Sequence, residues 1–118
     1  MAKIATTEDL TVEDRIELKC REYGIEPEIP LAIARLETGH FTSRAFKEGN
    51  NVGGLSINEV PMSFDTMEAG VEAFVQNLST NYFSQGLDTV EEIGAKYCPV
   101  NEDHWIKVVN QLIKEKRK

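Results

Sequence analysis

Cysteine, histidine and basic residues are all scarce in this sequence. Its 118 residues include two Cys, two His and 13 Lys or Arg against 20 Asp or Glu, a formal net charge of −7. Cys20 and Cys98 lie far apart without CxxC spacing, so we expect packed thiols and no disulfide framework. His40 and His104 fall in no HExxH or HxH arrangement, so no metal site is expected. The acidic balance argues against nucleic acid as a partner, because nucleic-acid binders carry a basic face.

Long hydrophobic runs are also missing. No apolar run approaches the roughly 18 residues that a membrane helix needs, so no membrane span is expected. The first ten residues, MAKIATTEDL, lack the apolar stretch of a secretory signal. We therefore expect synthesis in the cytoplasm, either of a complete protein or of a domain that belongs to a larger exported one.

The motifs of several enzyme classes are absent too. The sequence contains neither GxSxG nor a phosphate-binding GKS or GKT, and no cofactor is expected. A nucleophilic pair of Cys98 and His104 is conceivable, but no activating cation accompanies Cys98, which favours a packed thiol.

The residues that are present predict one helical domain. Apolar residues make up 41% of the chain, enough for a single core at this length. Residues 1–118 show no repeat or linker, residues 1–10 read as an N-terminal arm, and a monomer is favoured. Apolar spacing and capping signals predict about five helices. They are expected over residues 11–24, 27–39, 65–82, 89–97 and 101–112.

Two adjoining segments, residues 27–39 and residues 40–65, are expected to form the functional part of the molecule. Residues 27–39 are apolar on nearly all sides, which is typical of a central buried helix. Residues 40–65 are rich in Gly, Asn and Ser and read as an ordered loop, with a small hairpin around residues 55–64. Asp65 or Thr66 is expected to cap the helix that follows.

Glu37 stands out because it closes an otherwise apolar helix that a Gly-containing loop follows. Partial desolvation and the negative end of the helix dipole both disfavour its charged form, which raises the pKa. A carboxyl group with a raised pKa is suited to general acid catalysis near neutral pH. The competing interpretation is a structural ion pair with Arg35, Arg44 or Lys47.

The stretch IARLETGHFTS followed by NNVGGLS resembles lysozyme-like glycan hydrolases of bacterial cell walls. The closest type is the endo-β-N-acetylglucosaminidase, which is related to lytic transglycosylases. The resemblance rests on Glu-Thr-Gly at 37–39, Asn-x-x-Gly at 51–54 and the Tyr97 loop, and it covers roughly residues 28–113. It implies a mainly α, lysozyme-like fold with a small β element, and peptidoglycan glycan strands as the substrate.

The resemblance also implies roles for particular residues. Glu37 would be the general acid, and Tyr97 would face the cleft and orient Glu37 or stabilise the sugar intermediate. The candidate substrate-binding residues are Phe41, Ser43, Asn51 and Gly54. Asn51 and Gly54 would shape the loop that holds Glu37 and the glycan. Core packing is the competing interpretation for Phe41, and turn geometry is the competing interpretation for Asn51 and Gly54. Trp105 is expected in the core.

A second carboxylate is harder to assign. Glu59, at the expected hairpin tip, is the better candidate for a base that activates water, and Asp65 is equally explained as a helix cap. Without a base, one Glu can act as acid and then as base while a hydroxyl of the sugar closes a 1,6-anhydro ring.

Two other functions remain open. One is a non-catalytic lysozyme-like module that binds glycan or belongs to a virion or secretion apparatus. The other is a helical interaction domain that uses its acidic face on a basic partner. An enzyme of this kind without a signal would be a phage or prophage lysin acting at the bacterial cell wall, or a domain of a larger exported protein.

Overall fold

The computed structural model describes residues 10–117, with side chains to residue 116. The expected N-terminal arm therefore lies outside the described residues, except for residue 10. Six α-helices, two 3₁₀ turns and one hairpin make up the described part. In chain order they are α1 (Val12–Glu22), α2 (Glu28–Thr38), α3 (Arg44–Gly49), β1 (Ser56–Ile57), β2 (Val60–Pro61), α4 (Met67–Asn81), η2 (Phe83–Gln85), α5 (Val90–Tyr97), η3 (Pro99–Asn101) and α6 (Glu102–Arg117). The mainly helical class and the hairpin are confirmed.

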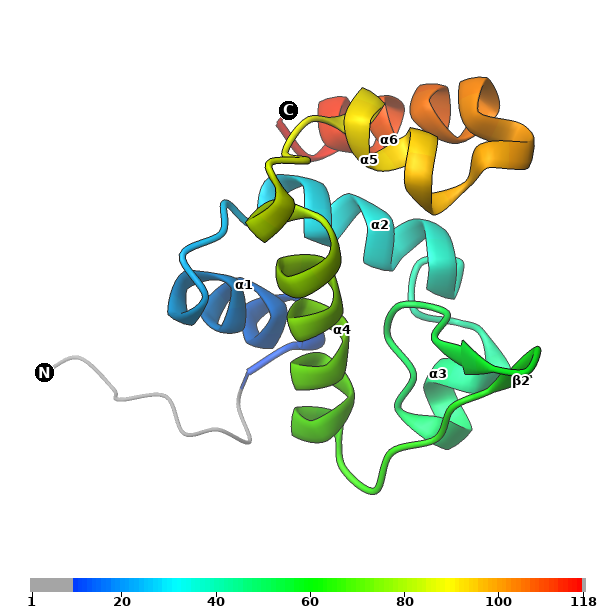
Figure 1. Ribbon diagram of the computed structural model, residues 1–118. Coiled ribbons are helices and arrows are strands. Elements are labelled where there is room, and N and C mark those ends of the chain that lie inside the picture. The colour runs from blue at the N-terminus through cyan, green and yellow to red at the C-terminus, as the bar shows by residue number, and fades with distance from the viewer. Residues whose placement is uncertain (1–9, 118) are drawn as a thin grey trace, which may run out of the picture.

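Helix α2 occupies the centre of the fold, as its apolar sequence predicts. Residues 30–35 are all buried in it, because α1 and α6 both pack against it. Figure 1 shows α5 and α6 lying along one side of α2, α1 and α4 on the other, and α3 with the hairpin beside the C-terminal end of α2. That end is where Glu37 lies. None of the described helices is long and apolar enough to cross a membrane.

Local sequence explains where the long helices begin and end. Thr11 and Asp14 form a reciprocal capping box at the start of α1, which satisfies backbone N–H groups that the helix leaves free. Gly39 ends α2 with a left-handed φ of 57°. Thr66, not Asp65, caps α4, since its hydroxyl accepts a hydrogen bond from the N–H of Ala69 at 3.0 Å.

The structure corrects one feature of the 40–65 segment. Helix α3 forms where only a loop was expected. The hydroxyl of Ser43 caps it by accepting from the N–H of Phe46, and Asn50 ends it in a left-handed conformation. Six residues make fewer than two turns, so no apolar periodicity marks such a helix in the sequence.

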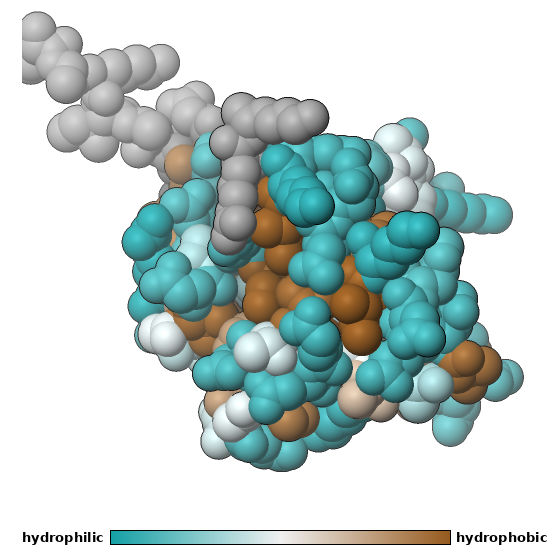
Figure 2. Space-filling model, turned by 90° about the horizontal axis from the view of Figure 1, so that it is seen from above, coloured by the Kyte–Doolittle hydropathy of each residue, from teal (hydrophilic) through white to brown (hydrophobic). Residues whose placement is uncertain are grey.

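The hairpin is short, and its outer surface is open to solvent. Ile57 pairs with Val60 in antiparallel register, and the two are 61% and 65% exposed. Asn58 and Glu59 form the tip, and both have positive φ. Positive φ at both central residues is what a type I′ hairpin turn requires. Seen from above, the molecule shows apolar residues in its middle, between hydrophilic side chains (Figure 2).

Candidate active site

Glu37 lies in the last turn of α2, one residue before the helix ends. Its side chain is half-buried, and this burial raises the pKa of its carboxyl group. The expected alternative, a structural ion pair, is not formed within the described residues. Arg35 instead pairs with Glu13, and Arg44 pairs with Glu48. Glu37 is therefore a desolvated carboxyl group without a cationic partner in the described part of the chain.

The residue after Glu37 fixes the backbone at this end of α2. Thr38 is fully buried. Its hydroxyl donates to the carbonyl of Ala34 at 2.6 Å and accepts from the N–H of Phe41 at 2.8 Å. Gly39, His40 and Phe41 then all take left-handed conformations. Left-handed conformations are maintained where surrounding contacts stabilise them. Here the two hydrogen bonds of Thr38 hold the backbone in this conformation.

Asn51 organises the loop that faces this helix end. It is 1% exposed, and its amide nitrogen donates to the carbonyls of Leu55 and Met62 at 2.8 and 3.0 Å. Its amide oxygen accepts from the N–H of Leu55 at 3.0 Å. One buried side chain thus satisfies three backbone groups and connects the loop to the chain that follows the hairpin.

The backbone of this loop comes very close to its neighbours at two glycines. A Cβ atom built on Gly54, which has a φ of +66°, falls 2.6 Å from Oε2 of Glu37. A Cβ atom built on Gly53 falls 2.1 Å from the ring of Phe74. A side chain at residue 53 would overlap the ring of Phe74, and one at residue 54 would displace the carboxyl group of Glu37 and strain the backbone. Gly54 is exposed, so the carboxyl group of Glu37 lies beside accessible backbone.

Tyr97 joins the same group from the end of α5. Its hydroxyl donates to the carbonyl oxygen of Gly53 at 3.1 Å. Its ring stacks on Trp105, with centroids 5.3 Å apart, and Trp105 is in the core as expected. Burial and, after it, the negative charge of Glu37 raise the pKa of Tyr97. The hydroxyl is therefore neutral and a hydrogen-bond donor at physiological pH.

A groove begins at the residue after Gly54 and runs between the hairpin segment and α4. Its volume is about 480 Å³, within the range typical of ligand sites. Its lining contains amides, hydroxyls and apolar side chains and no charged residue. The lining residues are Leu55, Ser56, Met62, Ala73, Gln76, Asn77, Thr80 and Asn81. Sequence reasoning missed the residues on α4, because they form the polar face of an ordinary amphipathic helix.

The structure separates the remaining candidates. Phe41 packs against Phe46, with ring centroids 5.4 Å apart, and Ser43 caps α3. Glu59 is exposed at the hairpin tip and makes no ion pair within the described residues. Asp65 is exposed just before α4.

The cysteines show no sign of activation. Burial raises the pKa of Cys20 to about 12, so its thiol stays protonated. Cys98 is half-buried at the end of α5, and His104 is exposed on α6. No hydrogen bond joins these two within residues 10–116. The nucleophilic-pair alternative gains no support from this arrangement.

The fold and the site together define a class of protein. A helical domain whose central helix ends in a desolvated Glu, next to a hairpin lobe and an uncharged groove, fits a lysozyme-like cell-wall hydrolase. Residues 14–118 match the model of the glucosaminidase family, described as mannosyl-glycoprotein endo-beta-N-acetylglucosaminidase. The match spans nearly the whole sequence, and the chain therefore belongs to the glucosaminidase family. No curated protein matches the chain. Membership makes a glycan the implied class of substrate.

Proposed function

We propose that this protein cleaves β-1,4 glycosidic bonds in the glycan strands of bacterial peptidoglycan, with Glu37 as the general acid. One observation carries the proposal: the carboxyl group of Glu37 is desolvated, has no cationic partner in the described chain and lies against the exposed backbone of Gly54. A carboxyl group with a raised pKa holds its proton to a higher pH than an ordinary Glu does and can donate it to a leaving oxygen.

The first chemical step follows from this environment. The glycosidic oxygen accepts the proton of Glu37 as its bond to the anomeric carbon breaks. Positive charge then develops on the sugar while Glu37 becomes a carboxylate. Gly54 leaves room for the substrate at this carboxyl group, since any side chain there would occupy the space of Oε2.

Tyr97 supports this step through the loop. Its hydroxyl bond to Gly53 joins α5 to the residue immediately before Gly54. The ring of Tyr97 is held in turn by the stack on Trp105. We therefore assign Tyr97 as a positioning residue that keeps the backbone of Gly54 against Glu37.

The groove between the hairpin segment and α4 suits a neutral glycan. Sugar hydroxyl and acetamido groups pair with amide and hydroxyl side chains, and Gln76, Asn77 and Thr80 supply these. Leu55 and Met62 provide apolar surface for the C–H faces of the rings. An uncharged lining adds no local repulsion for the substrate, whereas the overall charge of −7 slows the approach of the protein to an anionic wall at low salt.

Two routes complete the reaction, and they differ in what attacks the sugar. In hydrolysis, a carboxylate base removes a proton from water, and the hydroxyl adds to the anomeric carbon. Glu59 is the candidate base, because an exposed hairpin tip leaves its side chain free to reach the cleft. In transglycosylation, the attacking group is a hydroxyl of the same sugar that carries the anomeric carbon. The carboxylate of Glu37 removes the proton of this hydroxyl, whose oxygen then bonds to the anomeric carbon. This step closes a 1,6-anhydro ring and regenerates the acid.

Digestion of purified cell walls tests the proposal. The protein is expected to lower the turbidity of the walls and to release fragments whose new ends are identified by mass spectrometry. Reducing glucosamine, reducing muramic and 1,6-anhydromuramic ends distinguish the bond and the route. Folded protein that sediments with insoluble walls but releases no new ends would contradict cleavage and favour a glycan-binding or virion or secretion-apparatus module.

A further inference from the structure

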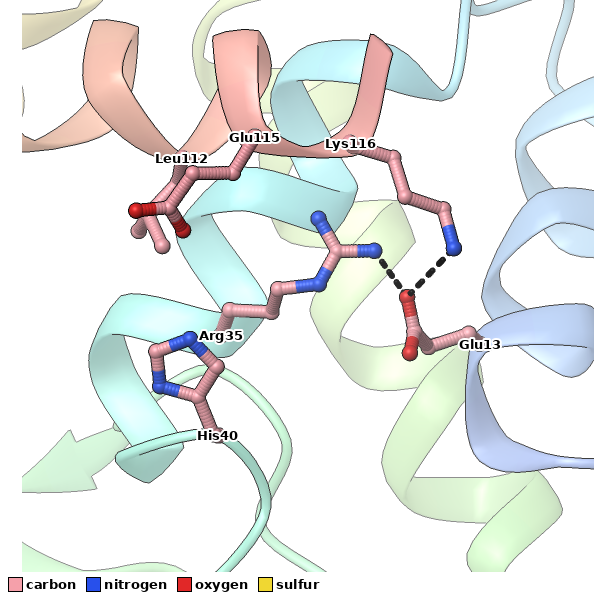
Figure 3. Close-up of a pocket in the computed structure, with 6 residues that line it drawn as sticks. All are labelled: Glu13, Arg35, His40, Leu112, Glu115 and Lys116. Atoms are coloured by element: carbon pink, nitrogen blue, oxygen red, sulfur yellow. Dashed lines mark hydrogen bonds and ion pairs between the residues drawn. The ribbon is translucent and has the colours of Figure 1, made fainter. Parts of the chain in front are cut away.

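A separate pocket lies on the other side of α2 from Glu37. Arg35 precedes Glu37 by two residues, which places their side chains about 200° apart around the helix. The pocket has a volume of about 200 Å³ and forms where α1, α2 and the last turns of α6 meet (Figure 3). We call it the Arg35 pocket. It is lined by Glu13, Arg35, His40, Leu112, Glu115 and Lys116.

Arg35 provides hydrogen-bond donors to this pocket. Its side chain is 10% exposed, and one Nη nitrogen pairs with Glu13. Figure 3 shows the other Nη nitrogen pointing away from Glu13 toward α6. A guanidinium carries five N–H donors, and Glu13 supplies the one acceptor that Arg35 has among the described residues. Arg35 is not among the fully buried groups that lack a partner, so its remaining N–H groups reach the solvent of the pocket and are accessible to an acceptor oxygen of a ligand.

The charges that surround the pocket are balanced. Arg35 and Lys116 are positive, and Glu13 and Glu115 are negative. The ammonium of Lys116 lies 3.9 Å from the carboxylate of Glu13, while Glu115 has no ion pair within the described chain. A simple anion would meet two carboxylates here, and a simple cation would meet two positive groups. A zwitterion matches both signs.

The size of the pocket limits the ligand. About 200 Å³ is below the range of roughly 300–1,000 Å³ that larger small-molecule ligands occupy. A neighbouring cavity of about 260 Å³ shares Arg35 and Lys116 and is walled by the carboxylates of Glu17 and Glu26. A ligand held by its carboxylate on Arg35 therefore lies among acidic side chains, and of these Glu115 lines the Arg35 pocket itself.

We propose that the Arg35 pocket binds a zwitterionic amino acid or dipeptide, with the carboxylate on Arg35 and the ammonium group toward Glu115. This binding function is separate from glycan cleavage and requires no contact with Glu37. The exposed ring of His40 borders the pocket. We therefore expect the backbone amide signal of His40 to respond when a ligand binds there.

Titration of the ¹⁵N-labelled full chain with alanyl-alanine tests the proposal by NMR. We expect shifts centred on the amides of His40, Leu112 and Glu115. N-acetyl-alanyl-alanine and alanyl-alanine amide each lack one of the two charges, and each is expected to bind at least tenfold more weakly. Alanine tests whether a single amino acid is sufficient. Absence of shifts at these amides with both alanine and alanyl-alanine, or equal affinity for the capped dipeptides, would overturn the proposal.

Variants assign the two charges. Arg35→Met alone strips Glu13 of its partner, so it is combined with Glu13→Met, which removes both charges at similar volume. This double variant is expected to lose at least tenfold in affinity for alanyl-alanine. Glu115→Gln, on the exposed end of α6, is expected to lose about fivefold and decides the matter if the double variant does not fold. Arg44→Gln is the control and should bind as the wild type does. Wild-type affinity in Glu115→Gln and in a folded double variant would refute the assignment.

Discussion

Replacement of Gly54 by alanine isolates the close contact on which the site depends. The new methyl group would fall 2.6 Å from Oε2 of Glu37 at a residue with a φ of +66°. That separation is far below ordinary van der Waals contact, so one of the two groups must move by most of an ångström. The carboxyl group is the end of a flexible side chain, whereas the loop backbone is held by Asn51 and Tyr97. We therefore expect Glu37 to move.

The structure gives different magnitudes for stability and activity. A non-glycine residue in the left-handed region costs about 1–2 kcal/mol in the free energy of unfolding. Displacement of a reacting group by about 1 Å can cost roughly 100-fold in rate. Gly54→Ala should thus lose about 1–2 kcal/mol of stability and about 100-fold in wall-cleavage rate.

Gly24→Ala is the matched control for this variant. Gly24 also has a left-handed φ, +71°, but an added Cβ atom meets nothing within 4 Å. It should show the same loss of stability in urea denaturation and keep the wild-type rate of cleavage. If Gly54→Ala cleaved walls within about threefold of Gly24→Ala, the idea that Gly54 makes room for Glu37 would be wrong, because the expected loss is about 100-fold.

Three further predictions concern the same site. Tyr97→Phe removes the hydrogen bond from the hydroxyl to Gly53, so we expect a loss of about 0.5–1.5 kcal/mol in the free energy of unfolding. We also expect roughly a tenfold lower rate of wall cleavage. An unchanged rate would contradict a positioning role for Tyr97. Because burial raises the pKa of Glu37, its contribution to stability is present below the ordinary carboxyl pKa and is lost as pH rises through the higher pKa of the folded state. Urea titrations across this range should show that slope in the wild type, and its persistence in Glu37→Gln would assign it elsewhere. If Glu59 is the base, Glu59→Gln should lower the rate of wall cleavage at least about 100-fold. Asp65→Asn should change this rate little, because Asp65 does not cap α4. Near-wild-type rates for both variants, with 1,6-anhydro products, would leave the route in which Glu37 acts alone.

Much of this architecture could be predicted because its signals are local. The apolar segment that ends in Glu37 predicts a buried helix with a desolvated carboxyl group at its end, and both features are present. Thr11 and Gly39 mark helix ends through their own hydrogen bonding and backbone conformation. The hairpin was expected from two short β-prone runs around Asn58 and Glu59, and it is present at those residues.

Other features depend on contacts between distant segments and leave no local signal. The resemblance places Gly54 in the loop that holds Glu37, but no local signal shows that the two residues are in direct contact rather than Gly54 serving as an ordinary turn glycine. The bond from Tyr97 to Gly53 spans 44 residues. Asn51 resembled a candidate ligand for substrate, yet its amide is used by the backbone of its own loop. The composition of residues 40–49 also concealed α3, because a helix of fewer than two turns that Ser43 caps has the same residue types as a loop.

The rate of wall cleavage by Glu37→Gln tests the central claim most directly. The substitution keeps the size of the side chain and removes its proton, and Glu48→Gln makes the same change at an exposed residue of α3 that pairs with Arg44. Circular dichroism establishes that both variants are folded before rates are compared by the release of new glycan ends. We expect Glu37→Gln to lose at least about 100-fold and Glu48→Gln to cleave at the wild-type rate. Retention of more than about a tenth of the activity by folded Glu37→Gln would contradict the role of Glu37 as the general acid.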